Sequence, residues 1–165
     1  MSEQPECQMP TPGAEHNDLL SAVGKWNVAC TYYMDPSQPP MQTQAVETIE
    51  PCGGFWTVSR FESDFGGMPF LGRCTMGYDP RAGKWIATWV DSMMPHMYVM
   101  EGNYDDAGKV LTMNSEGPAP GSGETTNYRS TWEKLDDGNR RFEMFVTLPE
   151  VGEVKMFTHI YTRAG

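Results

Sequence analysis

Apolar and polar residues alternate over most of the chain after residue 24, and clusters of Pro, Gly and Asp separate the alternating runs. A period of two is typical of β-strands that bury one face. The alternation predicts about ten strands. They are expected near residues 25–34, 41–49, 55–65, 69–78, 85–93, 97–104, 110–116, 125–135, 140–148 and 154–163. Short strands at this spacing favour an all-β sandwich or barrel.

Helical periodicity appears once, in residues 14–23, which follow Thr11-Pro12 and stop at Gly24. A proline in the first turn and a glycine after the last are ordinary helix boundaries. We expect residues 1–13 to form a flexible tail and residues 14–165 a single barrel domain.

The connections between the predicted strands fall into two groups. Those after even-numbered strands are tight, whereas those after odd-numbered strands are looser and contain more Pro and Gly. Alternate turns of an up-and-down meander lie at opposite ends, so the first and last strands run antiparallel and can close a barrel. The helix would then plug the tight end and the loose loops would form a mouth. Six methionines lie in or beside these loops: Met34, Met41, Met68, Met93, Met94 and Met97. They suit a portal for apolar ligands, but they could equally be packing filler.

The hairpin at residues 69–93 predicts an aromatic wall. If Tyr78 pairs with Trp85, Gly72 pairs with Asp91 and alternate residues share one face. That face carries Phe70, Gly72, Cys74, Met76, Tyr78, Trp85, Ala87, Trp89, Asp91 and Met93. Tyr98 and Met100 could extend it. Such a wall could fill a dry core, but a ten-stranded barrel is wider than the eight-stranded kind, so we expect some cavity.

Charge and composition exclude several functions. The chain has 165 residues, 22 acidic and 12 basic, with a net charge of −10. Phosphates and anionic lipids would be repelled, so we expect neither a nucleic-acid nor a membrane partner. No apolar run approaches the roughly 20 residues of a membrane span, and no signal peptide is recognisable. The four cysteines are scattered without a CxxC pair, which favours reduced thiols in a cytoplasmic protein. We expect a monomer or a homodimer.

Several motifs resemble a known family. Gly24-Lys25-Trp26 opens the first strand and Arg163 ends the last. This is similar to the calycin arrangement of lipocalins and fatty-acid-binding proteins, in which a basic residue covers a GxW tryptophan. More specifically, the chain resembles domain-of-unknown-function family 1579 (DUF1579). The matching segments are 15–26, 53–54, 67–79, 89–93, 101–112 and 161–163. The resemblance implies a calycin-like barrel with structural roles for Trp26 and Arg163, but no settled activity and no catalytic residue.

Asp91 is the leading candidate for chemistry. A carboxylate in an apolar cavity has a raised pKa and suits acid–base work or ligand binding. Gly72, its expected partner, would leave space above it. Alternatively, Asp91 pairs with Arg60, Arg73 or Arg129, or with amides at the strand end.

The three histidines are weaker candidates. His96, in a mouth loop, could assist Asp91 or be a solvated loop residue. His159 alternates with Phe157 and Tyr161 and could face the interior. It could ligate a heme, as in barrel proteins of the nitrobindin type, but a core role is favoured and no cofactor is expected. His16 is expected to be a surface or capping residue. No metal-binding spacing is present.

The leading hypothesis is therefore a barrel that binds a small apolar or amphipathic molecule. The predicted ligand-binding residues are Phe70, Met76, Tyr78, Trp89, Asp91, Met93, Tyr98 and His159. Tyr161 and Arg163 also resemble, in reversed order, the pair that grips carboxylates in fatty-acid-binding proteins. The alternatives are an isomerase, cyclase or hydrolase that uses Asp91 and His96 in the cavity, and a protein–protein module without a ligand.

Overall fold

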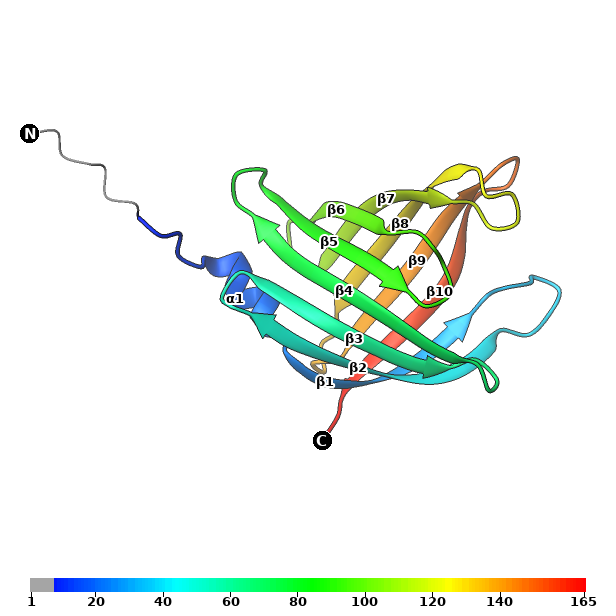
Figure 1. The fold of residues 1–165 in the computed structure, drawn as a ribbon, viewed down its shortest axis with the longest axis horizontal. Coiled ribbons are helices and arrows are strands. Elements are labelled where there is room, and N and C mark those ends of the chain that lie inside the picture. Colours follow the sequence, from blue (N-terminus) through cyan, green and yellow to red (C-terminus); the bar gives the residue numbers. More distant parts are fainter. Residues whose placement is uncertain (1–7) are drawn as a thin grey trace, which may run out of the picture.

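A computed structural model describes residues 8–165, so residues 1–7 of the predicted tail lie outside the described part of the chain. One helix, α1 (Ala14–Leu20), precedes ten strands. The strands are β1 (Gly24–Tyr32), β2 (Met41–Cys52), β3 (Trp56–Asp64), β4 (Pro69–Asp79), β5 (Lys84–Asp91), β6 (Tyr98–Tyr104), β7 (Val110–Pro118), β8 (Thr125–Lys134), β9 (Arg140–Leu148) and β10 (Gly152–Arg163). They form a closed antiparallel up-and-down barrel (Figure 1), which confirms the predicted fold class.

The two ends of the barrel differ as the turn pattern predicts. The loops after β1, β3, β5, β7 and β9 lie together at one end, and α1 lies at the other (Figure 1). We call these the loop end and the helix end. At the tight turns Gly53, Gly83 and Gly108 adopt positive φ angles near 64°, a conformation that glycine accepts without strain.

The helix is shorter than predicted. It begins at Ala14, as predicted, with Gly13 as its N-cap, but it ends at Leu20 rather than at residue 23. The Gly13 N–H donates to His16 Nδ1 at 2.9 Å, so His16 is a capping residue as expected. His16 is nevertheless buried, with its ring packed edge-on against Phe55 and Tyr78 and its Nε2 3.1 Å from the Tyr78 carbonyl oxygen. The expectation of a surface position was wrong.

Barrel closure joins β1 to β10, with Trp26 opposite Arg163. The Arg163 guanidinium lies 4.0 Å from the centre of the Trp26 ring and donates to the carbonyl oxygens of Val23 and Ser21. A Cβ at Gly24 would sit 2.5 Å from Arg163 Nη1, and Gly24 has a φ of 135°. Glycine is therefore required here both for space and for backbone conformation, which explains the GxW motif.

The inward-facing side chains form two connected apolar clusters. One centres on Trp26, Val28 and Phe61, and the other on Trp85, Leu111 and Met113. Trp89 and Trp132 pack against both clusters. The core is therefore continuous through the barrel.

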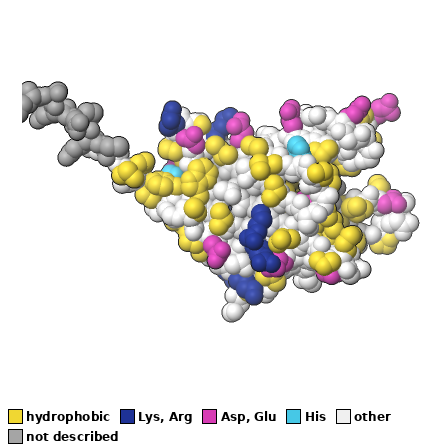
Figure 2. All heavy atoms as spheres, viewed as in Figure 1, with side chains coloured by type: hydrophobic (Ala, Val, Ile, Leu, Met, Phe, Trp, Pro, Cys, Tyr) yellow, Lys and Arg dark blue, Asp and Glu magenta, His cyan; other side chains and the backbone are white. Residues whose placement is uncertain are grey.

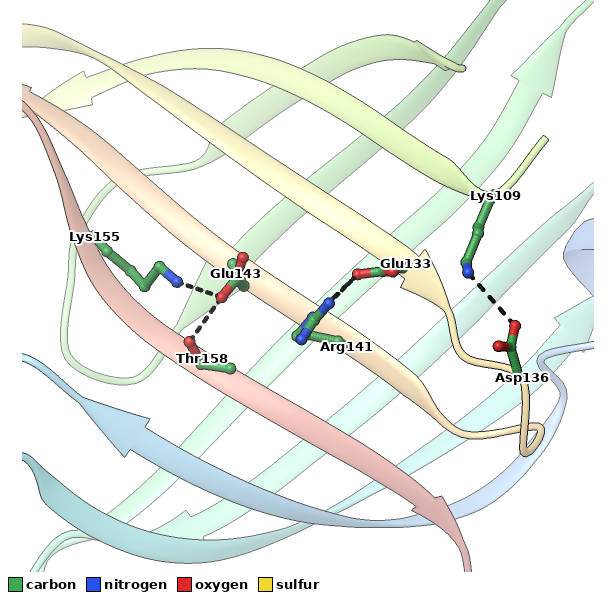
Figure 3. A network of polar contacts seen from close by, with 7 residues as sticks. All are labelled: Lys109, Glu133, Asp136, Arg141, Glu143, Lys155 and Thr158. Atoms are coloured by element: carbon green, nitrogen blue, oxygen red, sulfur yellow. Dashed lines mark hydrogen bonds and ion pairs between the residues drawn. The ribbon is translucent and has the colours of Figure 1, made fainter. Parts of the chain in front are cut away.

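The outer wall carries charged pairs. Arg141 pairs with Glu133, and Glu143 accepts from Lys155 at 2.5 Å and from Thr158 at 3.1 Å, along the outer faces of β8, β9 and β10 (Figure 3). These pairs are only partly shielded from solvent, so each adds little stability. Figure 2 shows hydrophobic side chains at the loop end with acidic side chains among them. Met34, Met68 and Met97 are the most exposed of the loop-end methionines. In the described part of the chain, no helix is long and apolar enough to cross a membrane.

Candidate functional site

The interior of the barrel contains a cavity of about 60 Å³ in its helix half. Its wall is mostly apolar and aromatic, and we call the space the inner pocket. The apolar lining includes Leu19, Trp26, Ile49, Met76, Trp85, Leu111 and Trp132. Four inward-facing polar side chains lie among them: Glu47, Thr57, Ser59 and Tyr161. An apolar pocket with a few convergent polar groups is the usual form of a small-molecule site.

Glu47 is the most unusual residue of the inner pocket. It lies on β2 between Trp26 of β1 and Phe61 of β3, and only 4% of its surface is exposed. Ser59 donates a hydrogen bond to Glu47 Oε1. Burial raises the pKa of the Glu47 carboxyl, and the hydroxyls of Ser59 and Tyr161 lower it by less. No salt bridge to Glu47 is found within residues 8–165.

The two titratable neighbours of Glu47, Cys74 and Tyr161, are neutral at pH 7. Burial, and then the nearby Glu47 carboxyl, raise the pKa of the Cys74 thiol to about 12. The same two causes, in the same order, raise the pKa of Tyr161 well above its ordinary value. Cys74 is therefore a thiol rather than a reactive thiolate, and both groups offer hydrogen bonds without charge.

Two basic side chains line the inner pocket toward the helix end, and both are engaged. Lys134 Nζ lies 2.7 Å from Asp18 Oδ1 and 4.5 Å from the centre of the Tyr104 ring. Arg140 donates to Ser21 Oγ at 3.1 Å, and its guanidinium lies 5.5 Å from the centre of the Trp26 ring. These contacts tie β8 and β9 to the segment around α1, so the cations serve to close this end.

The loop half of the interior is an aromatic cluster around His159. The His159 ring is stacked against Phe61 and Phe157, with centroids 5.4 and 4.7 Å away. Its Nε2 lies 3.3 Å from the Tyr32 hydroxyl. Burial lowers the pKa of His159 to about 3. His159 thus faces the interior, as the alternation indicated, and is uncharged at neutral pH. Phe70 and Trp89, two predicted ligand-binding residues, belong to the same cluster.

Asp91 lies at the loop end, away from the inner pocket. Its Oδ2 accepts from Trp89 Nε1 at 2.9 Å, and its Oδ1 accepts from the amides of Met93 and Met94 at 2.9 and 3.0 Å. The sequence left two kinds of partner open for Asp91, loop amides or an arginine, and the structure shows the amides. Arg60 and Arg129 instead pair with Glu62 and Glu153.

The β4–β5 register is as predicted, with Tyr78 opposite Trp85 and Gly72 opposite Asp91. The expected space above Gly72 is absent, however. A Cβ on Gly72 would lie 2.1 Å from Trp89 Cη2, so the indole ring fills that position. Met76 and Tyr78 belong to the cluster at the helix half, whereas Phe70 belongs to the other. The predicted ligand-binding residues are therefore spread along the barrel.

A groove of about 920 Å³ lies on the outer wall at the loop end. The pairing of β6 with β7 runs from Glu101–Asn114 to Tyr104–Leu111, so Tyr98–Met100 lie beyond the paired part. His96 Nε2 lies 3.3 Å from the Glu116 carbonyl oxygen, and the ring packs edge-on against Tyr98. The 94–97 loop thus covers the gap between the strands and forms one side of the groove, which we call the outer groove.

Glu47 was absent from the sequence-based candidates. Glu47 alternates with Ala45 and Ile49 along β2, and the β1–β2 pairing sets it opposite Trp26. Val46 and Thr48 alternate with these residues, so the face of β2 that carries them could equally have been the buried one.

Within residues 8–165, no group of three or more His, Cys, Asp or Glu side chains could hold a metal ion.

The fold and this interior define a small closed β-barrel with a helix across one end. The model of the family described as "Protein of unknown function (DUF1579)" matches residues 11–163, and the chain belongs to this family. A search of curated proteins finds no match.

Among solved structures, the chain is similar to the crystal structure of Rv2717c from M. tuberculosis, with a TM-score of 0.68 and 13% identity over 94% of this chain and 100% of the other. This likeness shows the fold alone. A redesigned beta barrel, b11L5F_LGL, matches with a TM-score of 0.48 and 13% identity over 94% of this chain and 100% of the other.

Proposed function

We propose that this protein binds a small apolar or amphipathic molecule inside the barrel, with its polar end in the inner pocket. The observation that carries the proposal is Glu47, an acid buried without a cationic partner among the described residues, beside an internal cavity. An uncompensated buried carboxyl costs folding free energy, so packing alone does not account for it.

The surroundings of Glu47 support binding rather than simple filling. Cys74, Met76 and Trp132 face the interior, yet each keeps some accessible surface because it borders the cavity. Rings of Trp26, Trp132 and Tyr161 pack edge-on or tilted against one another nearby. Aromatic walls give a ligand large contact area at low entropic cost.

The first test is native mass spectrometry on protein purified from its own cells, which should reveal a small molecule that dissociates on unfolding. Binding of a neutral fluorescent dye, and its displacement by an extract of the same cells, gives the solution assay. Cys74→Trp fills the inner pocket and should abolish dye binding, with Cys74→Met as a milder version. Asn114→Trp, on the outer wall and lining the outer groove, is the matched control and should bind as the parent does.

Far-UV circular dichroism should show all three variants folded. Absence of both a co-purified molecule and dye displacement would rule the proposal out. Loss of binding in Asn114→Trp alone would move the site to the outer groove and contradict the proposal equally.

A further inference from the structure

We propose that the inner pocket takes a hydrogen-bond-donating group, a hydroxyl, amide N–H or ammonium, and discriminates against carboxylates such as those of fatty acids. The inference rests on the proposed function and names the chemical class of its ligand. It is carried by the position of Glu47 at the cavity and by the contacts that Lys134, Arg140 and Arg163 already make.

Glu47 offers the ligand an acceptor. Ser59 donates to Oε1 and the Tyr161 hydroxyl also bonds the carboxyl, but a carboxyl has further acceptor sites, and the Glu47 side chain lines the cavity. A carboxyl oxygen in a water-poor pocket stabilises a donor strongly, because there is little solvent to compete for it. An anionic ligand would instead place a second acid beside Glu47, and like charges at short range in low dielectric repel.

Within residues 8–165, each basic side chain around the inner pocket already has a partner. Arg163 lies on β10, the strand that closes the barrel. Together with Tyr161 it resembles the pair that binds carboxylates in fatty-acid-binding proteins. Here, however, its guanidinium lies over the Trp26 ring and donates to the carbonyl oxygens of Val23 and Ser21. Lys134 borders the pocket and is paired with Asp18. Arg140 donates to Ser21 Oγ, and its guanidinium lies 5.5 Å from the centre of the Trp26 ring.

The cavity also limits the size of the polar end. A volume of about 60 Å³ has room for only a few water-sized groups. A hydroxymethyl or aminomethyl group fits this space, while the rest of the molecule lies against the aromatic rings. The Glu47 carboxyl can accept a hydrogen bond from an alcohol. An ammonium is stabilised by the carboxylate form of Glu47, whose pKa burial raises, so binding of an amine strengthens as pH rises.

The indole N–H groups allow a site-specific test, because the five tryptophans occupy different positions. Trp26, Trp85 and Trp132 line the inner pocket, Trp89 lies in the loop half, and Trp56 is 38% exposed on the outer wall. We would titrate ¹⁵N-tryptophan-labelled protein at pH 7 with benzyl alcohol, benzylamine and benzoate. These three probes share a ring and differ in the polar group.

Benzyl alcohol and benzylamine should shift the Trp85 and Trp132 resonances, leave Trp56 unchanged, and bind at least tenfold more tightly than benzoate. Glu47→Gln should keep alcohol binding within about threefold, weaken amine binding at least tenfold, and reduce the discrimination against benzoate. Glu47→Leu should weaken alcohol binding as well. Glu62→Gln, on the outer face of the adjacent strand, is the matched control and should behave as the parent does.

The outcomes separate this inference from the proposed function. Equal binding of all three probes at the pocket indoles, or preferences that survive Glu47→Leu, would overturn the inference and leave a binding barrel standing. Absence of any pocket shift with all three probes, while the protein is folded, would overturn both.

Discussion

Replacement of His159 by Phe should make the protein less sensitive to acid. His159 is 7% exposed and lies among Phe61, Phe157 and Tyr32, where burial lowers its pKa from 6.5 to about 3. The unfolded chain therefore binds a proton at this position below about pH 6.5, whereas the folded chain stays neutral until about pH 3. Stability from the neutral ring is fully present above the unfolded pKa and is lost as pH falls toward the folded pKa.

The size of the effect follows from these two pKa values. Between pH 7.5 and pH 5.0, protonation of the unfolded state lowers the free energy of unfolding by about 2 kcal/mol through this one residue. Phenylalanine matches the shape of the aromatic site and carries no proton. His159→Phe should remove this about 2 kcal/mol difference, while at pH 7.5 it should cost under about 1.5 kcal/mol as a near-isosteric change.

Urea unfolding followed by tryptophan fluorescence at the two pH values measures both quantities. Phe142→Leu, whose ring centroid is 6.0 Å from that of His159, is the control. It should lower stability equally at both pH values. The reasoning is refuted if parent and His159→Phe lose the same stability between pH 7.5 and pH 5.0.

Three further substitutions test other parts of the account. Glu47→Gln should raise the stability of the protein at neutral pH. The pKa of the Glu47 carboxyl is raised by folding, so the folded state becomes less stable as pH rises above the pKa of this carboxyl in the unfolded chain. Thermal unfolding at pH 5 and pH 8 checks the sign. Gly72→Ala should destabilise by about 1–3 kcal/mol, because the new Cβ meets the Trp89 ring at 2.1 Å, and an unchanged urea midpoint would contradict this. Arg163→Ala should cost about 1–3 kcal/mol through the lost Trp26 and carbonyl contacts, whereas exposed Arg73→Ala should cost under about 0.5 kcal/mol in the same assay.

The architecture could be predicted because its signals are local. The alternation of apolar and polar residues predicted all ten strands, usually with ends within two residues of the observed ones. The tight turns predicted which connections lie at each end of the barrel. The β4–β5 register followed from one pairing of Tyr78 with Trp85. The helix begins at the predicted residue but ends at Leu20 rather than at residue 23. Its N-terminal cap contact comes from His16, a residue that propensity rules do not expect in that role.

The site was harder to predict because it depends on contacts across the barrel. Asp91 drew attention as an acid on an aromatic face, but its proximity to the strand end lets loop amides satisfy it. Glu47 lies in the middle of β2. Its two hydrogen-bond partners, Ser59 and Tyr161, come from β3 and β10 and meet it only when the sheet is closed. No pattern within β2 alone distinguishes such a residue from a solvent-facing glutamate in an alternating strand.

The most direct test of the central claim is a crystal structure of the protein bound to the molecule that co-purifies with it, or to benzyl alcohol. Ligand density is expected inside the barrel, with a polar atom within hydrogen-bond distance of Glu47 and the ring against Trp132 or Trp85. Density in the outer groove near Met94 and Asn127, with an empty interior, would contradict it.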